Sequence, residues 1–220
     1  MRRSLKNMIY KITQTKDDFL EKIYKESLDD LNAFYEINWT HHLPRIFVVN
    51  DRKTIDLLKG EKTEDWLVGW VEGKTAYILN KNNLKKESNH KYNPDEYFAL
   101  VKHEISHLFF RTLSGGNAKP IWLNEGVAIY TSGQNEFKKK PTEFSKFLEF
   151  YDNGGKEIYS EAGFFVQALI EKFGKPKLLN LVKDLKNIKN KEEFEKFFAK
   201  EYGFGLNYEE INTQGVYKSA

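Results

Sequence analysis

The chain of 220 residues has no cysteine. This absence excludes a disulfide framework, thiolate ligands for a metal ion and a cysteine nucleophile. No apolar run comes near the roughly 20 residues that a membrane-spanning helix needs, so no membrane span is expected. The basic N-terminus is not followed by the apolar core of a secretory signal, because charged residues such as Lys11, Asp17 and Asp18 interrupt it. We therefore expect a cytoplasmic protein, while a secreted mature form that has lost its leader stays open.

A strong excess of charge of one sign is also missing. Lys and Arg number 35 against 32 Asp and Glu, which gives a formal net charge of +3. The densest basic run, residues 138–140, precedes Pro141 and is expected to be a solvated loop. Because the basic residues are not segregated, nucleic acid is not an expected partner. The glycines at 115 and 116 lack the Lys and Ser/Thr of a phosphate-binding loop.

What the chain does contain is a clear order of strand and helix patterns, with aromatic residues at 15% to build a core. Three strands are expected, at residues 45–50, 66–72 and 75–80, with the last two joined through Gly73 as a hairpin. Residues 81–92 are polar and are expected to form a loop. The expected helices, in chain order, are residues 17–38, 54–59, 94–113, 121–131, 142–151, 160–173, 176–187 and 191–201.

Strands that come mostly before helices predict an α+β fold. We expect a single domain over residues 1–220, with an upper lobe at about 1–113 and a lower helical lobe at about 114–220. A small twisted sheet in the upper lobe would lie over the helix at 94–113. That helix has the clearest start signal, since Asn93 can cap it and proline follows at the first helical position.

His103, Glu104 and His107 form an H-E-x-x-H motif in the middle of this helix. Helix positions i and i+4 lie about 40° apart, so both imidazoles leave the same face and can close on one Zn²⁺. Glu104 lies about 100° round the helix, where it can act as general base on a water without binding the metal. Apolar neighbours such as Val101 and Ile105 indicate a buried helix, in which three polar side chains need partners.

A catalytic zinc ion usually has three protein ligands, so one further ligand is expected from another element. Glu125 is the candidate, because it lies in the apolar run Ile-Trp-Leu-Asn-Glu-Gly on the helix expected at 121–131. A helix, a short glycine-containing loop and a returning helix can bring Glu125 back beside His103 and His107. The alternative is that Glu125 is an ordinary surface glutamate, which fits poorly with the apolar residues on both sides of it.

The two motifs together resemble the gluzincin metallopeptidases. H-E-x-x-H followed by Trp-Leu-Asn-Glu-Gly at 122–126 is most similar to the branch of the peptidase-MA clan that contains the one-zinc aminopeptidases. The short chain is closer to the stand-alone, minigluzincin-type catalytic domains of that clan. The resemblance implies a zincin fold and one Zn²⁺ per chain, with His103, His107 and Glu125 as ligands and Glu104 as catalytic base. The spacing between the motifs is one residue shorter here than is usual in the aminopeptidases.

Two further roles follow only from this resemblance. Tyr159 opens a Tyr-Ser-Glu-Ala-Gly run similar to a helix start of the same branch, where a tyrosine hydroxyl assists the oxyanion. A core position for Tyr159 stays open. Related zincins pair an extended substrate with an edge strand, and four residues are assigned that substrate-binding role here: Val68, Gly69, Trp70 and Val71. Trp66 and Trp70 either line subsites or belong to the core.

The expected activity is zinc-dependent hydrolysis of peptide bonds inside a peptide or protein substrate. The Gly-Ala-Met-Glu-Asn motif of the aminopeptidases is absent, which favours an endopeptidase over an aminopeptidase. Three alternatives stay open. The chain could be a catalytically latent gluzincin-fold module that binds or regulates a partner, or a zinc hydrolase with a non-peptide substrate. It could also be a latent form whose cleft is covered by residues 212–220 or by the N-terminal helix. The sequence does not define the oligomeric state.

Other chemically active side chains are expected to have no catalytic role. His41, His42 and His90 are expected in loops without a metal ion. Ser106 and Ser160 have no base placed for a nucleophilic triad.

Overall fold

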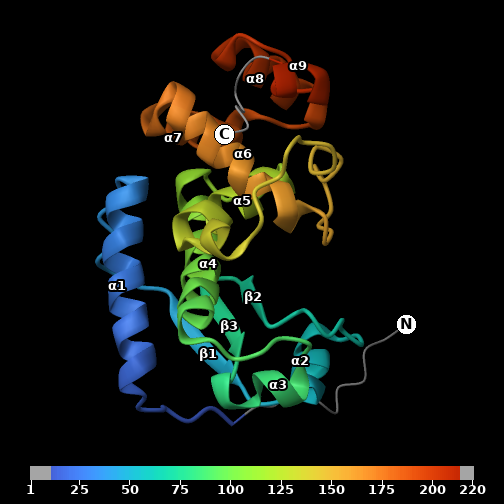
Figure 1. Ribbon diagram of the computed structural model, residues 1–220. Helices are drawn as coiled ribbons and strands as arrows, with labels where there is room; N and C mark the ends of the chain where they lie inside the picture. The colour runs from blue at the N-terminus through green and yellow to red at the C-terminus, as the bar shows by residue number, and fades with distance from the viewer. Residues whose placement is uncertain (1–10, 214–220) are drawn as a thin grey trace.

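The computed structural model describes residues 11–213, so residues 1–10 and most of the tail at 212–220 lie outside the described part. Figure 1 shows a small sheet beside one long central helix, with further helices grouped at the far end of that helix. The expected α+β class is therefore confirmed. Within the described residues, no helix has both the length and the apolar character needed to cross a membrane.

The sheet has three strands in the order β1-β3-β2, and these strands are β1 (Arg45–Val49), β2 (Gly69–Glu72) and β3 (Thr75–Leu79). β1 runs parallel to β3, and β2 pairs antiparallel with β3 through a tight turn at Gly73, whose φ is +59°. The predicted hairpin is confirmed, although its first strand begins at Gly69 rather than at residue 66. β2 is an edge strand among the described residues, and this edge lies on the side of the sheet away from β1.

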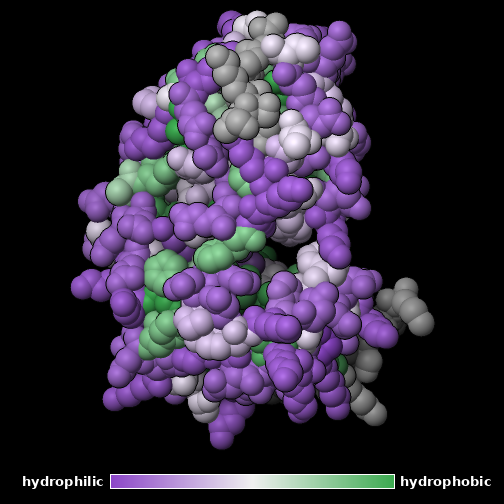
Figure 2. All heavy atoms as spheres, viewed as in Figure 1, coloured by the Kyte–Doolittle hydropathy of each residue, from purple (hydrophilic) through white to green (hydrophobic). Residues whose placement is uncertain are grey.

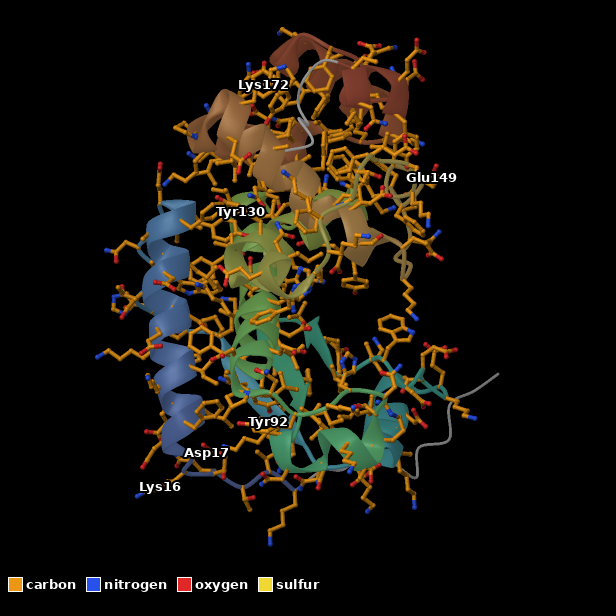
Figure 3. The ribbon with its side chains drawn as sticks, viewed as in Figure 1. Lys16, Asp17, Tyr92, Tyr130, Glu149 and Lys172 are labelled. Atoms are coloured by element: carbon orange, nitrogen blue, oxygen red, sulfur yellow. The ribbon has the colours of Figure 1, made fainter. Side chains whose placement is uncertain are left out.

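The central helix is α4 (Pro94–Leu113). Asn93 caps its start as predicted, because its side chain accepts hydrogen bonds from two backbone N–H groups. α1 (Asp18–Tyr35) lies beside it and is capped in the same way by Asp17, labelled at the foot of α1 in Figure 3. Lys102 of α4 and Asp30 of α1 join the two helices through an ion pair of 2.6 Å.

Hydroxyl groups of three side chains connect α1, α4 and the next helix. The Tyr35 hydroxyl lies 2.8 Å from Oγ of Ser106, which in turn lies 2.8 Å from Oγ1 of Thr131. Each of the three residues comes from a different helix, so Ser106 has a structural role inside the H-E-x-x-H segment. The side chains in these two contacts are a tyrosine, a serine and a threonine.

The helices after α4 are α5 (Ile121–Ser132), α6 (Ile158–Phe173), α7 (Lys175–Asp184), α8 (Lys191–Tyr202) and α9 (Tyr208–Thr213). α5 and α6 cross at very short range. A Cβ atom on Gly126 would lie 2.7 Å from the carbonyl oxygen of Ala162, and one on Gly163 would lie 2.3 Å from Ile129. The two glycines therefore allow α6 to approach the end of α5 that carries Glu125.

The expectation of a loop at residues 81–92 was wrong in part. Residues 81–92 are not entirely loop, since they contain a 3₁₀ turn, η2 (Lys81–Asn83), and a short helix, α3 (Leu84–Glu87). α2 (Arg52–Lys59) and α9 complete the small elements, and α9 had no expected counterpart.

The helix expected at 142–151 is absent, and turns and bends take its place. Backbone N–H groups here bind side chains from later elements instead of helical carbonyl groups. Glu161 of α6 accepts a hydrogen bond from the N–H of Ser145 at 2.9 Å, and the Tyr208 hydroxyl accepts one from the N–H of Leu148 at 2.8 Å. These long-range bonds fix an irregular path and thereby compete with a helix.

Candidate metal centre

His103 and His107 lie on one face of α4. Both are buried, with 4% and 6% of their surface exposed. Their Nε2 atoms are 3.0 Å apart, and the two rings meet edge to face at 89°. The separation of four residues therefore brings two imidazole nitrogens to one point, as the motif predicts.

Glu125 of α5 faces the same point. Its carboxylate oxygens lie 3.3 Å from Nε2 of His103 and 3.6 Å from Nε2 of His107. One ligand atom from each of the three residues falls within 4.8 Å of the other two. This buried group of two imidazoles and one carboxylate could hold a metal ion.

Unpaired polar atoms support that fit. Oε2 of Glu125 and Nδ1 of His103 are buried without a hydrogen-bond partner among the described residues. An unpaired buried polar atom is costly, and for Oε2 a cation would remove the cost by coordination. Nδ1 of His107 is different, because it lies 2.9 Å from Oδ1 of Asn124. That contact holds the proton on Nδ1 and leaves the Nε2 lone pair for a metal ion.

The protonation states also suit a metal ion. Burial lowers the pKa of His107 to about 4, so its imidazole is neutral at pH 7. Burial alone would raise the pKa of Glu125, but attraction to His107 and His103 outweighs it and lowers the pKa to about 2. Neutral imidazole and ionised carboxylate are the forms that coordinate a divalent ion.

Glu104 has a different environment from Glu125. Burial raises the pKa of Glu104 to about 7, with the charge on Glu125 adding to the increase and His103 opposing it. Its Oε2 atom is buried without a partner, while a Cβ atom on Gly69 would lie only 2.5 Å from its Oε1. Gly69 belongs to the edge strand β2, so the backbone of this strand lies directly against the Glu104 carboxyl group.

Tyr159 lies in the first turn of α6, close to both other helices. Interaction with Tyr159 contributes to the lowered pKa of Glu125, and the Tyr159 ring centroid lies 6.4 Å from that of His103. Burial raises the pKa of Tyr159 well above its ordinary value of 10, with Glu125 adding to the effect, so the hydroxyl stays protonated. The structure thus places Tyr159 beside the three ligands, half-buried at the surface of the site rather than inside the core.

A cleft of about 620 Å³ opens onto His103, Glu104 and Tyr159. Figure 2 shows the surface hollowed between the sheet-bearing half and the helical half of the molecule. Val68 and Gly69 line this cleft. Apolar and basic side chains also line the cleft, among them Trp66, Leu84, Leu100, Phe137, Lys138 and Lys156.

The four edge-strand residues named from the sequence do not all face the cleft. Trp70 is buried and stacks on Tyr77, with ring centroids 4.7 Å apart, so it packs within the sheet. Val71 is not among the residues that line the cleft, unlike Val68 and Gly69. Trp66 does line it, and its ring centroid lies 6.1 Å from that of Tyr159.

Two residues of the site could not be identified as such from the sequence. Asn124 sits inside the Trp-Leu-Asn-Glu-Gly run, but its contact with His107 depends on how α5 returns beside α4. Lys138 belongs to the basic run expected to be solvated, and that expectation is wrong for it, because its side chain is half-buried and lines the cleft. Of the histidines outside the motif, His90 lines the cleft, and its Nε2 atom lies 3.2 Å from the carbonyl oxygen of Trp66.

Comparisons of the chain with models of protein families, with curated proteins and with solved structures found no match. The geometry of the site and the two motifs are therefore the basis for the function proposed for this chain.

Proposed function

We propose that this chain is a zinc-dependent peptidase with a gluzincin-type zincin fold, and that it cleaves internal peptide bonds. One observation carries the proposal. His103, His107 and Glu125 converge within 4.8 Å, and a separate carboxyl group, Glu104, stands beside them at the wall of the cleft. A purely structural site would have no need for the separate carboxyl group.

Zinc is the metal that this set of ligands favours. Two imidazoles and one carboxylate form a three-ligand set that leaves one position open, which is typical of catalytic rather than structural zinc. The chain has no thiolate that would complete a closed structural site. When bound, the ion supplies a Lewis acid that polarises a carbonyl oxygen and makes water more acidic.

The chain's own residues supply the proton transfers. With a pKa of about 7, Glu104 is poised to accept a proton from the attacking water and to return it to the leaving amine. The Tyr159 hydroxyl remains a donor at this pH and stands beside the ligands, where it would hydrogen-bond the developing oxyanion. The pKa of Glu104 is high and suits a general base, whereas the pKa of Glu125 is low and suits a metal ligand.

Substrate positioning is the role of β2. Its outer edge has no strand partner among the described residues, and its first residue, Gly69, touches Glu104. An extended peptide paired along this edge would bring a main-chain carbonyl group close to the base and the ligands. Pairing through main-chain atoms is compatible with many sequences, which fits an endopeptidase.

The test is to incubate the zinc-loaded chain and its Glu104→Gln variant with a diverse peptide mixture and to identify the products by mass spectrometry. We expect cuts within peptides that vanish in the variant, although the variant still binds zinc. Cuts by both proteins would show that Glu104 is not the base. An absence of cuts by the zinc-loaded wild type would overturn the peptidase proposal in favour of a binding module or a hydrolase of another substrate class.

A further inference from the structure

The side chains that line the cleft carry an uneven charge. Four lysines line it, against two glutamates: Lys91, Lys138, Lys139, Lys156, Glu96 and Glu104. One of these glutamates is the proposed base. The net charge of the whole chain is only +3, so the cleft is more basic than the surface as a whole. A cleft with one sign of charge and low-dielectric walls attracts ligands of the opposite sign.

Lys138 differs from the other three lysines. They are exposed, whereas Lys138 is half-buried, and its Nζ atom lies 5.8 Å from the centre of the Tyr159 ring. No carboxylate of residues 11–213 lies within ion-pair distance of that Nζ atom. A charge in such a place is screened less by solvent and salt than an exposed charge, so a partner there is bound more strongly.

The backbone holds Lys138 in this position. α5 ends at Gly133, whose φ of +78° turns the chain into a 3₁₀ segment, η3 (Gln134–Phe137). Asn135 in this segment donates to the Gln167 side chain of α6 at 3.1 Å, and the N–H of Lys138 donates to the carbonyl oxygen of Asn135 at 3.1 Å. The ammonium group is thus presented from a fixed turn and not from a free loop.

We propose that Lys138 determines specificity as the centre of a carboxylate-binding subsite, so that preferred substrates carry a carboxylate near the scissile bond. This inference rests on the proposed function, because it treats the bound carboxylate as part of a peptidase substrate. The carboxylate can belong to an acidic side chain or to the C-terminus of a short peptide, and both present the same group to an ammonium ion. The apolar wall near Lys138, formed by Trp66 and Phe137, suits the aliphatic part of such a residue.

The protonation state of Lys138 agrees with this role. Burial lowers its pKa to about 8, and the charge on Glu125 acts in the opposite direction. At pH 7 the side chain therefore remains mostly protonated and can bind an anion.

The test measures binding, so it does not depend on turnover. Zinc-loaded Glu104→Gln protein, with and without Lys138→Met, is titrated into three fluorescent peptides of one sequence and followed by anisotropy. One peptide has an internal Glu and an amidated end, one has Gln and a free C-terminus, and one has Gln and an amidated end. We expect Lys138→Met to weaken binding of at least one carboxylate-bearing peptide by roughly tenfold and to leave the uncharged peptide unchanged.

Two control variants distinguish loss of the Lys138 charge from a general effect on the fold. Lys53→Met, on α2 and outside the cleft, should leave all three affinities unchanged, and Lys138→Arg should restore most of the lost affinity. The peptide that loses affinity identifies the source of the carboxylate. Equal affinities with and without Lys138→Met, or an equal loss for all three peptides, would overturn the subsite. Failure of the peptidase proposal would appear separately, as intact binding in this assay without any cleavage by the wild type.

Discussion

Asn124 and His107 form a buried contact in which Oδ1 of Asn124 lies 2.9 Å from Nδ1 of His107. The two residues come from different helices, and Asn124 is next to the ligand Glu125 in the chain. One short stretch of α5 therefore provides a metal ligand and also orients a ligand on α4. Partners of this kind fix the tautomer and the ring direction of a ligating histidine.

Loss of this partner should weaken metal binding. We expect Asn124→Ala to lower the affinity for zinc by about 10- to 100-fold, because the His107 ring is then free to turn and to change tautomer. Competition with a chromophoric chelator measures the affinity, and circular dichroism checks the fold. Asn124→Asp keeps an acceptor oxygen at the same place and should bind zinc far better than Asn124→Ala. Equal affinity of wild type and Asn124→Ala would rule out the orienting role.

Gly69 should matter for the position of the catalytic base, Glu104, and not for the binding of zinc. A Cβ atom there would lie 2.5 Å from Oε1 of Glu104, so Gly69→Ala must displace the carboxyl group. We expect kcat/KM for peptide cleavage to fall by roughly 100-fold, since small errors in the position of a catalytic group are costly. Zinc content should not change, because Glu104 is not a ligand. Gly154→Ala, where the nearest atom would be 3.9 Å away, is the matched control and should retain full activity.

The buried Glu104 should make the metal-free protein less stable as the pH rises. Burial raises its pKa from 4.5 to about 7, so between these values the folded protein keeps a proton that the unfolded chain has released. The free energy of unfolding then falls with rising pH through this range, by roughly 3 kcal/mol in total. We expect metal-free Glu104→Gln to exceed the wild type by about that amount at pH 8, and to differ little at pH 4.

Urea unfolding of both proteins in the presence of a chelator measures this difference at each pH. The comparison with the variant isolates Glu104, since all other titrating groups are common to the two proteins. A stability difference that does not change between pH 4 and pH 8 would contradict the raised pKa.

Ser106 should matter for stability and not for catalysis. Its hydroxyl links Tyr35 to Thr131 across three helices, and its removal leaves the buried Tyr35 hydroxyl without its shortest contact, at 2.8 Å. We expect Ser106→Ala to reduce the free energy of unfolding by about 1 kcal/mol while zinc content and kcat remain those of the wild type. A loss of turnover that exceeds the loss of folded protein would mean that Ser106 takes part in the reaction.

The sequence predicts those parts of this molecule that depend on neighbours along the chain. Asp17 and Asn93 each start a helix by capping backbone N–H groups, and the cap at Asn93 was predicted from the residue type. The convergence of His103 and His107 follows from helix geometry alone. The hairpin at Gly73 likewise follows from a turn that favours glycine.

Features set by long-range approach could not be predicted in this way. The helical spacing in 142–151 is outweighed by the Glu161 side chain, which binds the backbone from 16 residues away in sequence. The half-burial of Lys138 follows from the turn at Gly133 and its attachment to α6. The contact of Asn124 with His107 requires α5 to pack against α4, which no local pattern encodes.

The most direct test of the central claim is the zinc content of three proteins after dialysis against metal-free buffer, measured by plasma mass spectrometry: wild type, Glu104→Gln and His103→Ala. The account predicts one zinc ion per chain in the wild type and in Glu104→Gln, and almost none in His103→Ala, because His103 is a ligand and Glu104 is the base. Zinc retained in full by His103→Ala, or lost from Glu104→Gln, would contradict the account.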